Sequence, residues 1–197
     1  GGFAFRSIVF GDLPHRFRLE VFNPMGHGVG LFTVDRFMTR LWLPAEQTVY
    51  TSSQPEPLLE RMFGFSFPFE ALPYLMAATI RPEHLSSLEF KNTPTGWIAV
   101  NELKTAETRY SYTFLSSPLS LSKVTLRRGL WEYEVHYDPP VKLDREIVPK
   151  RLNIIGIDWT LEVSVEKMEK SEHLAHEIFI PQTPNGTRTV ELMGRIP

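Results

Sequence analysis

The chain has 197 residues, with 21 lysines and arginines, 23 aspartates and glutamates, and no cysteine. Its formal charge of −2 offers no basic excess for nonspecific binding to nucleic acid, and the absence of cysteine excludes disulfides, thiol catalysis and thiolate metal centres. The longest apolar stretch, residues 62–80, is interrupted by polar residues and prolines, so it does not reach the length of a membrane-spanning helix. This length suits one domain or a compact pair with a sizeable core.

Alternation of apolar and polar residues with a period of two dominates the sequence and predicts antiparallel strands. In chain order, the candidate segments are residues 3–10, 17–21, 29–34, 38–43, 47–51, 85–91, 97–102, 110–114, 119–127, 131–137, 147–154, 157–166 and 177–180. Short turns separate them, which favours pairing between strands that are neighbours in the sequence. We therefore expect a meander of about eleven strands. The alternation slips by one residue at Lys123, as a β-bulge would produce in a curved sheet.

One interval departs from this alternation and predicts helices. Residues 53–63 begin with serine, prolines and acids and then place apolar side chains at helical spacing from Leu58 to Phe63. A second helix is expected over residues 68–78, although Pro73 lies about one turn inside it, so this helix could instead begin there. We therefore expect a mainly β fold in which two or three helices cover one face of the curved sheet.

Two windows resemble the LolB family of outer-membrane lipoproteins. Residues 16–26 read RFRLEVFNPMG, similar to the family's basic-aromatic strand and Asn-Pro-apolar-Gly turn, and residues 64–78 read GFSFPFEALPYLMAA, similar to its Gly and Pro helix. The chain departs from the family at Ala78, where a glycine is expected at the helix end, and in the atypical extension of residues 174–197. If residues 3–10 match the family's second strand, the signal peptide, the lipid-bearing cysteine and the first strand would precede this sequence.

The resemblance implies a fold and a function together. The fold would be a single LolA/LolB-like domain over residues 1–197, an open half-barrel with helices covering its concave face. The function would be to shelter the acyl chains of lipoproteins in an apolar cavity and to help place them in the outer membrane. The resemblance also implies a periplasm-facing location in a Gram-negative bacterium, a monomer, a periplasmic carrier as partner, an N-terminal lipid anchor outside this sequence, and no cofactor.

Inward-pointing apolar side chains would line such a cavity, because each sequestered methylene contributes about 0.8 kcal/mol. The candidates are Phe17, Leu19, Val21, Leu31, Leu41, Leu43, Phe63, Phe67, Leu72, Leu75, Tyr110, Tyr112, Trp131 and Trp159. For any single one of them an ordinary core residue is the simpler interpretation, since packing alone demands the same pattern, so only the set as a whole indicates a cavity.

A turn made of Asn23, Pro24, Met25 and Gly26 is the candidate membrane or transfer loop. A type I or II turn would place Pro24 and Met25 at its corners and direct the methionine into solvent, where it has no benefit for folding. In the family, this turn is the apolar protrusion that meets the membrane or passes the lipoprotein on. The alternative is that Met25 folds back onto the sheet.

Enzyme and metal functions find no support in the motifs. His173 and His176 could share a helical face, but no third ligand stands at a defined spacing, so solvated surface histidines are the simpler interpretation. Ser66 lacks the closing glycine of a hydrolase elbow, and Glu132 and Glu134 lie on a polar strand face. The alternative function is a scaffold or interaction lipoprotein of the same fold with a closed cavity, which would use its tail to bind a partner.

Overall fold

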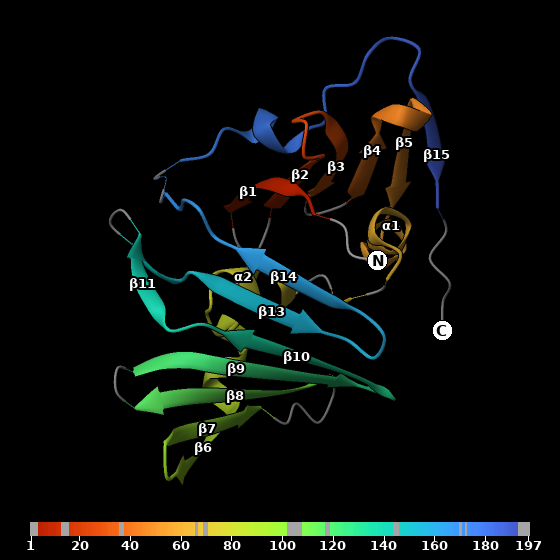
Figure 1. Ribbon diagram of the computed structural model, residues 1–197. Coiled ribbons are helices and arrows are strands. Elements are labelled where there is room, and N and C mark those ends of the chain that lie inside the picture. Colours follow the sequence, from red (N-terminus) through yellow and green to blue (C-terminus); the bar gives the residue numbers. More distant parts are fainter. Residues whose placement is uncertain are drawn as a thin grey trace. The chain divides into compact units, whose positions relative to one another are not determined.

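The computed structural model describes residues 4–12, 16–35, 38–65, 67–68, 71–101, 108–116, 119–143, 146–169, 171 and 173–192. The chain divides into two compact units. The first unit comprises Gly1–Pro73 and Ser171–Pro197, and the second unit comprises Tyr74–Lys170. Each unit contains one large sheet (Figure 1).

The first unit is built on a six-stranded sheet. Its strands, in spatial order, are β1 (Arg6–Asp12), β2 (Arg16–Phe22), β3 (Gly28–Val34), β4 (Thr39–Leu43), β5 (Thr48–Ser52) and β15 (Arg188–Glu191). The first five form an antiparallel meander, as the sequence predicts. The last, β15, comes from the C-terminal tail and pairs with β5 in parallel.

Strand β2 shows how the alternating pattern is used. Phe17, Leu19 and Val21 are buried, while Arg18 and Glu20 point to the opposite face and are only partly covered. This outcome confirms the predicted period of two. We call the side carrying these three buried residues the apolar face of the six-stranded sheet.

The first predicted helix is confirmed as α1 (Glu56–Phe63). Prolines stand at its start, and Gly64 ends it in a left-handed conformation with φ of 79°, donating its N–H to the carbonyl oxygen of Glu60 at 2.8 Å. The helix lies beside β4 and β5 (Figure 1). A short 3-10 helix, η1 (Pro44–Glu46), connects those two strands.

The second predicted helix is shorter than expected. Its described part is α2 (Leu72–Met76), which begins close to Pro73, the alternative start. Ala78, where a glycine is expected, follows with φ of 49°, and the N–H of Thr79 bonds back to the carbonyl oxygen of Tyr74 at 2.9 Å. This is the left-handed helix end that usually carries glycine. Among the described residues, no helix has the length and apolarity needed to cross a membrane.

The second unit is built on a seven-stranded antiparallel sheet. Its strands, in spatial order, are β14 (Thr160–Ser164), β13 (Arg151–Ile155), β10 (Trp131–Tyr137), β9 (Leu119–Arg128), β8 (Thr108–Ser116), β7 (Gly96–Asn101) and β6 (Leu88–Thr93). A separate hairpin joins β11 (Pro140–Leu143) to β12 (Glu146–Pro149), and the 3-10 helix η3 (Pro82–Ser87) precedes β6. The predicted slip is confirmed, because Ser122, beside Lys123, has no opposite residue on β8.

The expectation of one curved sheet of about eleven strands in an open half-barrel is wrong. Over the described residues the strands form sheets of six and seven with a separate hairpin, and no sheet is closed or strongly curled. The reason lies at β5, whose second edge pairs with β15 from the tail instead of with β6. The helical interval therefore ends the first meander, and β6 starts a new one.

Three strand predictions also change in detail. Residues 177–180 are not a strand, because His176–Phe179 forms the 3-10 helix η4 and its Phe179 is buried. Residues 147–154 divide into β12 and β13 at Lys150. The strand expected over residues 157–166 is restricted to β14, since the chain is still turning at Trp159, whose indole packs close to Gly156.

Candidate functional site

The apolar face of the six-stranded sheet brings several candidate lining residues together. Phe17, Leu19 and Val21 on β2 share this face with Leu41 on β4, and all four are buried. Met62 of α1 reaches the same face, because a Cβ placed on Gly30 would lie 2.8 Å from its Cε atom. The contact between the flexible thioether of Met62 and the backbone of Gly30 can rearrange at low cost.

Polar contacts hold α1 against β5. The guanidinium of Arg61 lies over the ring of Tyr50 at 4.0 Å and donates to the carboxylate of Glu46 at 2.7 Å. The Tyr50 hydroxyl also donates to that carboxylate. These hydrogen bonds, from Tyr50 first and then from Arg61, lower the pKa of Glu46. One end of α1 is therefore fixed to the sheet by a cation–π and ion-pair contact rather than by apolar packing alone.

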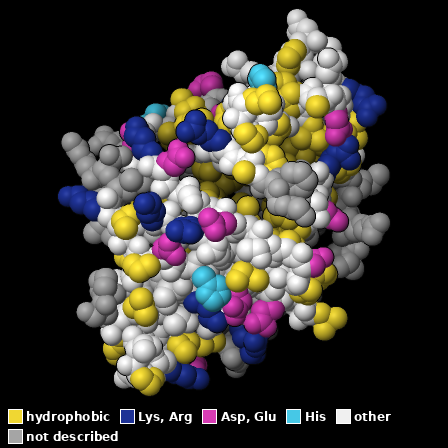
Figure 2. All heavy atoms as spheres, viewed as in Figure 1, with side chains coloured by type: hydrophobic (Ala, Val, Ile, Leu, Met, Phe, Trp, Pro, Cys, Tyr) yellow, Lys and Arg dark blue, Asp and Glu magenta, His cyan; other side chains and the backbone are white. Residues whose placement is uncertain are grey.

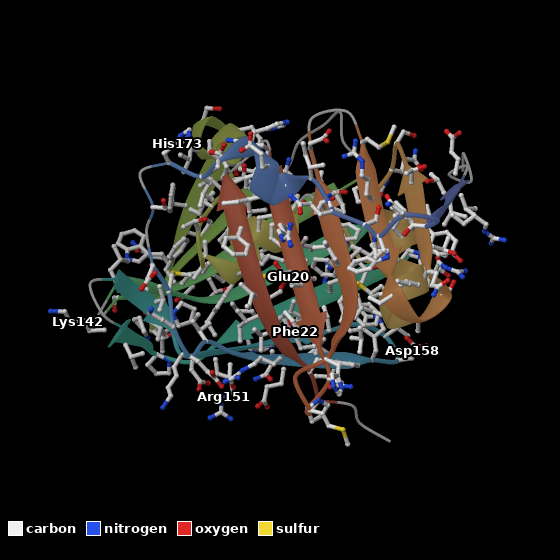
Figure 3. All side chains as sticks on the ribbon, turned by 90° about the horizontal axis from the view of Figure 1, so that it is seen from above. Glu20, Phe22, Lys142, Arg151, Asp158 and His173 are labelled. Carbon is white, nitrogen blue, oxygen red and sulfur yellow. The ribbon has the colours of Figure 1, made fainter. Side chains whose placement is uncertain are left out.

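Leu31 does not belong to the apolar face. It pairs with Glu20 on β2 and with Trp42 on β4, so all three side chains point to the opposite side of the sheet. Leu31 is nevertheless buried, because the C-terminal segment from Glu177 to Gln182 covers that side. Figure 3 shows η4 lying over one end of β1 and β2.

A groove of about 440 Å³ lies between this outer side of the sheet and the tail. Phe22, Trp42 and Ile178 contribute apolar walls, and Arg18 crosses the groove to donate a hydrogen bond to the carbonyl oxygen of Ile178. The indole N–H of Trp42 is buried and has no hydrogen-bond partner among the described residues. Sequence reasoning missed this groove, since its tail wall comes from a segment predicted to be a strand and nothing local predicts its contact with β2.

The candidate transfer loop is a compact turn. The N–H of Gly26 donates to the carbonyl oxygen of Asn23 at 2.9 Å, and the side-chain oxygen of Asn23 accepts hydrogen bonds from the N–H groups of Met25 and His27, both at 3.0 Å. Gly26 has a φ of 84°, a conformation that favours glycine. The side chain of Met25 is 84% exposed, so it does not fold back onto the sheet.

In the second unit, Tyr110 and Tyr112 lie side by side on β8 with ring centroids 6.2 Å apart. The hydroxyl of Tyr112 and Nδ1 of the buried His84 are 2.7 Å apart, and Arg81 reaches the hydroxyl of Tyr110 at 3.3 Å. Burial raises the pKa of Tyr112 and, together with Arg81, lowers the pKa of His84. The tyrosine is therefore the donor and the neutral imidazole the acceptor, which makes this group a satisfied buried cluster.

The remaining candidates are spread over both units. Phe67 and Leu75 are buried, whereas Leu43, Phe63, Leu72 and Trp159 are half-buried and Trp131 is exposed. The structure thus collects five lining candidates on the apolar face of the six-stranded sheet, because the half-buried Leu43 shares the face of Leu41, and two in the β8 cluster. Ser66 lies outside the described residues.

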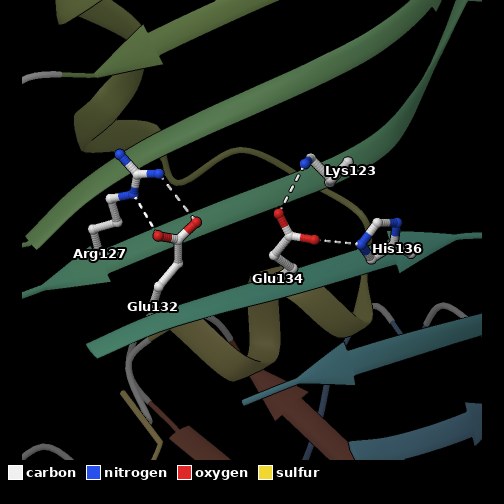
Figure 4. A network of polar contacts seen from close by, with 5 residues as sticks. All are labelled: Lys123, Arg127, Glu132, Glu134 and His136. Atoms are coloured by element: carbon white, nitrogen blue, oxygen red, sulfur yellow. Dashed lines mark hydrogen bonds and ion pairs between the residues drawn. The ribbon is translucent and has the colours of Figure 1, made fainter. Parts of the chain in front are cut away.

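The acidic residues considered for catalysis lie in a surface network on β9 and β10 (Figure 4). Glu132 binds Arg127 through two hydrogen bonds of 2.8 and 3.2 Å. Glu134 accepts from Lys123 at 2.9 Å and lies 2.8 Å from His136, and both contacts lower its pKa. Each carboxylate therefore has its own cation, which is typical of a solvated strand face rather than of an acid–base pair.

His176 begins the 3-10 helix η4, and His173 lies three residues before it. Of the side chains that the structure describes, no three histidine, aspartate or glutamate residues are grouped so that they could hold a metal ion. The ring nitrogen Nδ1 of His176 instead lies 3.4 Å from a guanidinium nitrogen of Arg16.

Comparison with known proteins assigns the chain to a family. A search of curated proteins finds no significant relative. The sequence profile of the family described as "Outer membrane lipoprotein LolB" matches residues 7–166, which include β2, the Asn23–Gly26 turn, both α-helices and the seven-stranded sheet. This match covers well over half of the chain, so the chain belongs to the LolB family of outer-membrane lipoproteins.

Proposed function

We propose that this protein is a lipoprotein receptor that binds acyl chains and helps to place lipoproteins in the outer membrane. The observation that carries the proposal is the family match over residues 7–166. The role requires binding and release without a chemical step. The proposed partners are lipoproteins, a periplasmic carrier that delivers them and the periplasmic leaflet of the outer membrane, with the protein acting as a monomer.

The apolar face of the six-stranded sheet is the proposed resting place of the acyl chains. Phe17, Leu19, Val21 and Leu41 supply an aliphatic and aromatic surface without charge. Because these side chains are buried in this structure, binding requires the side chains packed on the face, Met62 of α1 among them, to move aside. An acyl chain then replaces side-chain contacts, and about 0.8 kcal/mol per methylene favours the exchange.

Photolabelling tests this placement. A triacylated lipopeptide with a diazirine in its acyl chain is bound to the protein, irradiated, and its attachment sites are mapped by mass spectrometry. We expect labels on inward residues of β2 and β4 and on α1, and none with the same peptide lacking acyl chains. Labels confined to the outer groove at Phe22 and Trp42 would contradict the placement.

The Asn23–Gly26 turn is proposed to be the transfer loop. Met25 is held at the tip by the hydrogen bonds of Asn23, so an apolar side chain is presented to a membrane without loss of folding contacts. We expect Met25→Glu to change the free energy of unfolding by less than about 0.5 kcal/mol while it slows lipopeptide transfer to vesicles severalfold. Met25→Leu serves as the control and should retain transfer.

A scaffold with a closed cavity is the second candidate function, because the apolar face is buried in this structure. Such a protein would bind a partner but no acyl chain. Pull-down of lipoprotein after removal of its acyl chains separates the two candidates, since a scaffold would still capture it and an acyl-chain receptor would not.

A further inference from the structure

Two turns of the second unit meet at one end of the seven-stranded sheet. β9 ends at Arg128 and β10 begins at Trp131, so the turn at Gly129 and Leu130 closes this end. Ile155 of β13 pairs with Glu134 of β10, which brings the turn from residues 156–159 to the same end. Figure 1 shows both turns on the right of the sheet. We call residues 127–131 and 155–159 the hairpin end.

Large apolar side chains are exposed at the hairpin end. Leu130 is 97% exposed, Ile157 is 67% exposed and Trp131 is 55% exposed. Figure 2 shows hydrophobic atoms projecting from the surface there. Leu130 makes almost no contact that would stabilise the fold, and a tryptophan beside it has the amphipathic ring that is enriched at membrane–water interfaces.

Arginines flank the apolar tip of the hairpin end. Arg127 and Arg128 belong to it, and Arg109 of β8 pairs in register with Arg127. The described acidic residues there are Glu132, which binds Arg127, and Asp158. Arginines beside an apolar tip are suited to a surface of lipid phosphates.

We propose that the hairpin end is a second membrane contact, in which Leu130 and Trp131 enter the interface of an anionic bilayer and the arginines contact its phosphates. A stable protein interface buries about 800 Å² on each partner, whereas a narrow hairpin tip offers only a few side chains. Insertion into lipid needs no larger surface. The inference extends the proposed function, which assigns membrane contact to the Asn23–Gly26 turn alone.

Vesicle co-sedimentation of the full chain tests the proposal, with vesicles of phosphatidylcholine and phosphatidylglycerol and with vesicles of phosphatidylcholine alone. We expect Leu130→Ser to weaken binding about tenfold, because one buried leucine is lost from the lipid phase. Arg128→Gln should weaken binding about fivefold on the anionic vesicles only. The matched control is Leu119→Ser, since Leu119 is 74% exposed at the other end of β9. This variant should bind the vesicles as the unchanged protein does.

Several results would overturn the proposal. They are the absence of vesicle binding by the unchanged chain, equal binding by Leu130→Ser and the unchanged chain, and equal losses in Leu130→Ser and Leu119→Ser. The unfolding temperature of each variant is measured in parallel and should stay unchanged, because both leucines are exposed. The vesicle assay contains no lipoprotein. Its failure would overturn the second membrane contact alone, whereas failure to bind the acylated lipopeptide would overturn the proposed function.

Discussion

Ala78 has a backbone conformation that favours glycine over alanine. The sequence places alanine where a glycine is expected, and the structure gives it a φ of 49°, which costs an alanine roughly 1 kcal/mol relative to glycine. We expect Ala78→Gly to raise the free energy of unfolding by about that amount, measured by urea denaturation. Ala77→Gly is the matched control and should destabilise, because residue 77 does not have a positive φ.

His84 makes stability depend on pH. Its pKa in the folded protein is lowered, first by burial and then by Arg81, whereas in the unfolded chain it has its ordinary value near 6.5. The unfolded chain therefore takes up the proton first as the pH falls, and stability declines below about pH 6.5. Protonation would also remove the acceptor that Nδ1 offers to the hydroxyl of Tyr112.

We expect His84→Gln to flatten the dependence of unfolding free energy on pH between 7 and 5, measured by denaturation at several pH values. Tyr112→Phe is the control. Loss of the hydroxyl should lower the free energy of unfolding by about 1–3 kcal/mol, but the imidazole stays buried, so the dependence of that free energy on pH should remain. A slope that persists in His84→Gln would show that other groups are responsible.

At the scale of elements, the β6–β7 hairpin depends on Gly96. A Cβ at this position would lie 1.9 Å from the carbonyl oxygen of Phe114 on β8, a backbone atom that cannot move alone. We expect Gly96→Ala to lower the free energy of unfolding by about 2 kcal/mol or more, measured by thermal denaturation. Gly28→Ala should cost less than about 1 kcal/mol, because its Cβ would only touch the ring of Phe22 at 4.0 Å.

The C-terminal tail is a structural element of the first unit. Phe179 is fully buried, the guanidinium of Arg16 lies 4.8 Å from its ring centre, and β15 pairs with β5. We expect Phe179→Ala to cost about 3–5 kcal/mol of stability and the exposed Ile180→Ala to stay within about 0.5 kcal/mol. Equal stability of the two variants, measured in urea, would favour the alternative in which the tail is free to bind a partner.

The elements differ in how far the sequence could predict them. β2 was predictable because one of its sides is buried and the other is charged. β3 was located correctly, but Leu31, Phe32 and Thr33 are all buried in succession, so alternation could not assign Leu31 to a face. The parallel pairing of β15 with β5 joins segments about 140 residues apart, and no local pattern encodes such a contact.

At the scale of the whole molecule, the motifs in residues 16–26 and 64–78 predicted the family, and the profile match over residues 7–166 confirms it. The exposed Met25 was also predictable, since a four-residue turn leaves its second corner in solvent. The groove beside Trp42 was not predictable, because it depends on the path of the tail. The exposure of Leu130 was not predictable either, because this residue belongs to no periodic pattern. Acyl-chain binding on the apolar face remains a prediction.

Native mass spectrometry with a synthetic triacylated lipopeptide tests this central claim most directly. The protein is mixed with the lipopeptide or with the same peptide lacking acyl chains, and the complexes are counted at several concentrations. A receptor of the LolB type is predicted to bind the triacylated form and to ignore the peptide alone. Equal binding of both forms, or binding of neither, would contradict the proposed function.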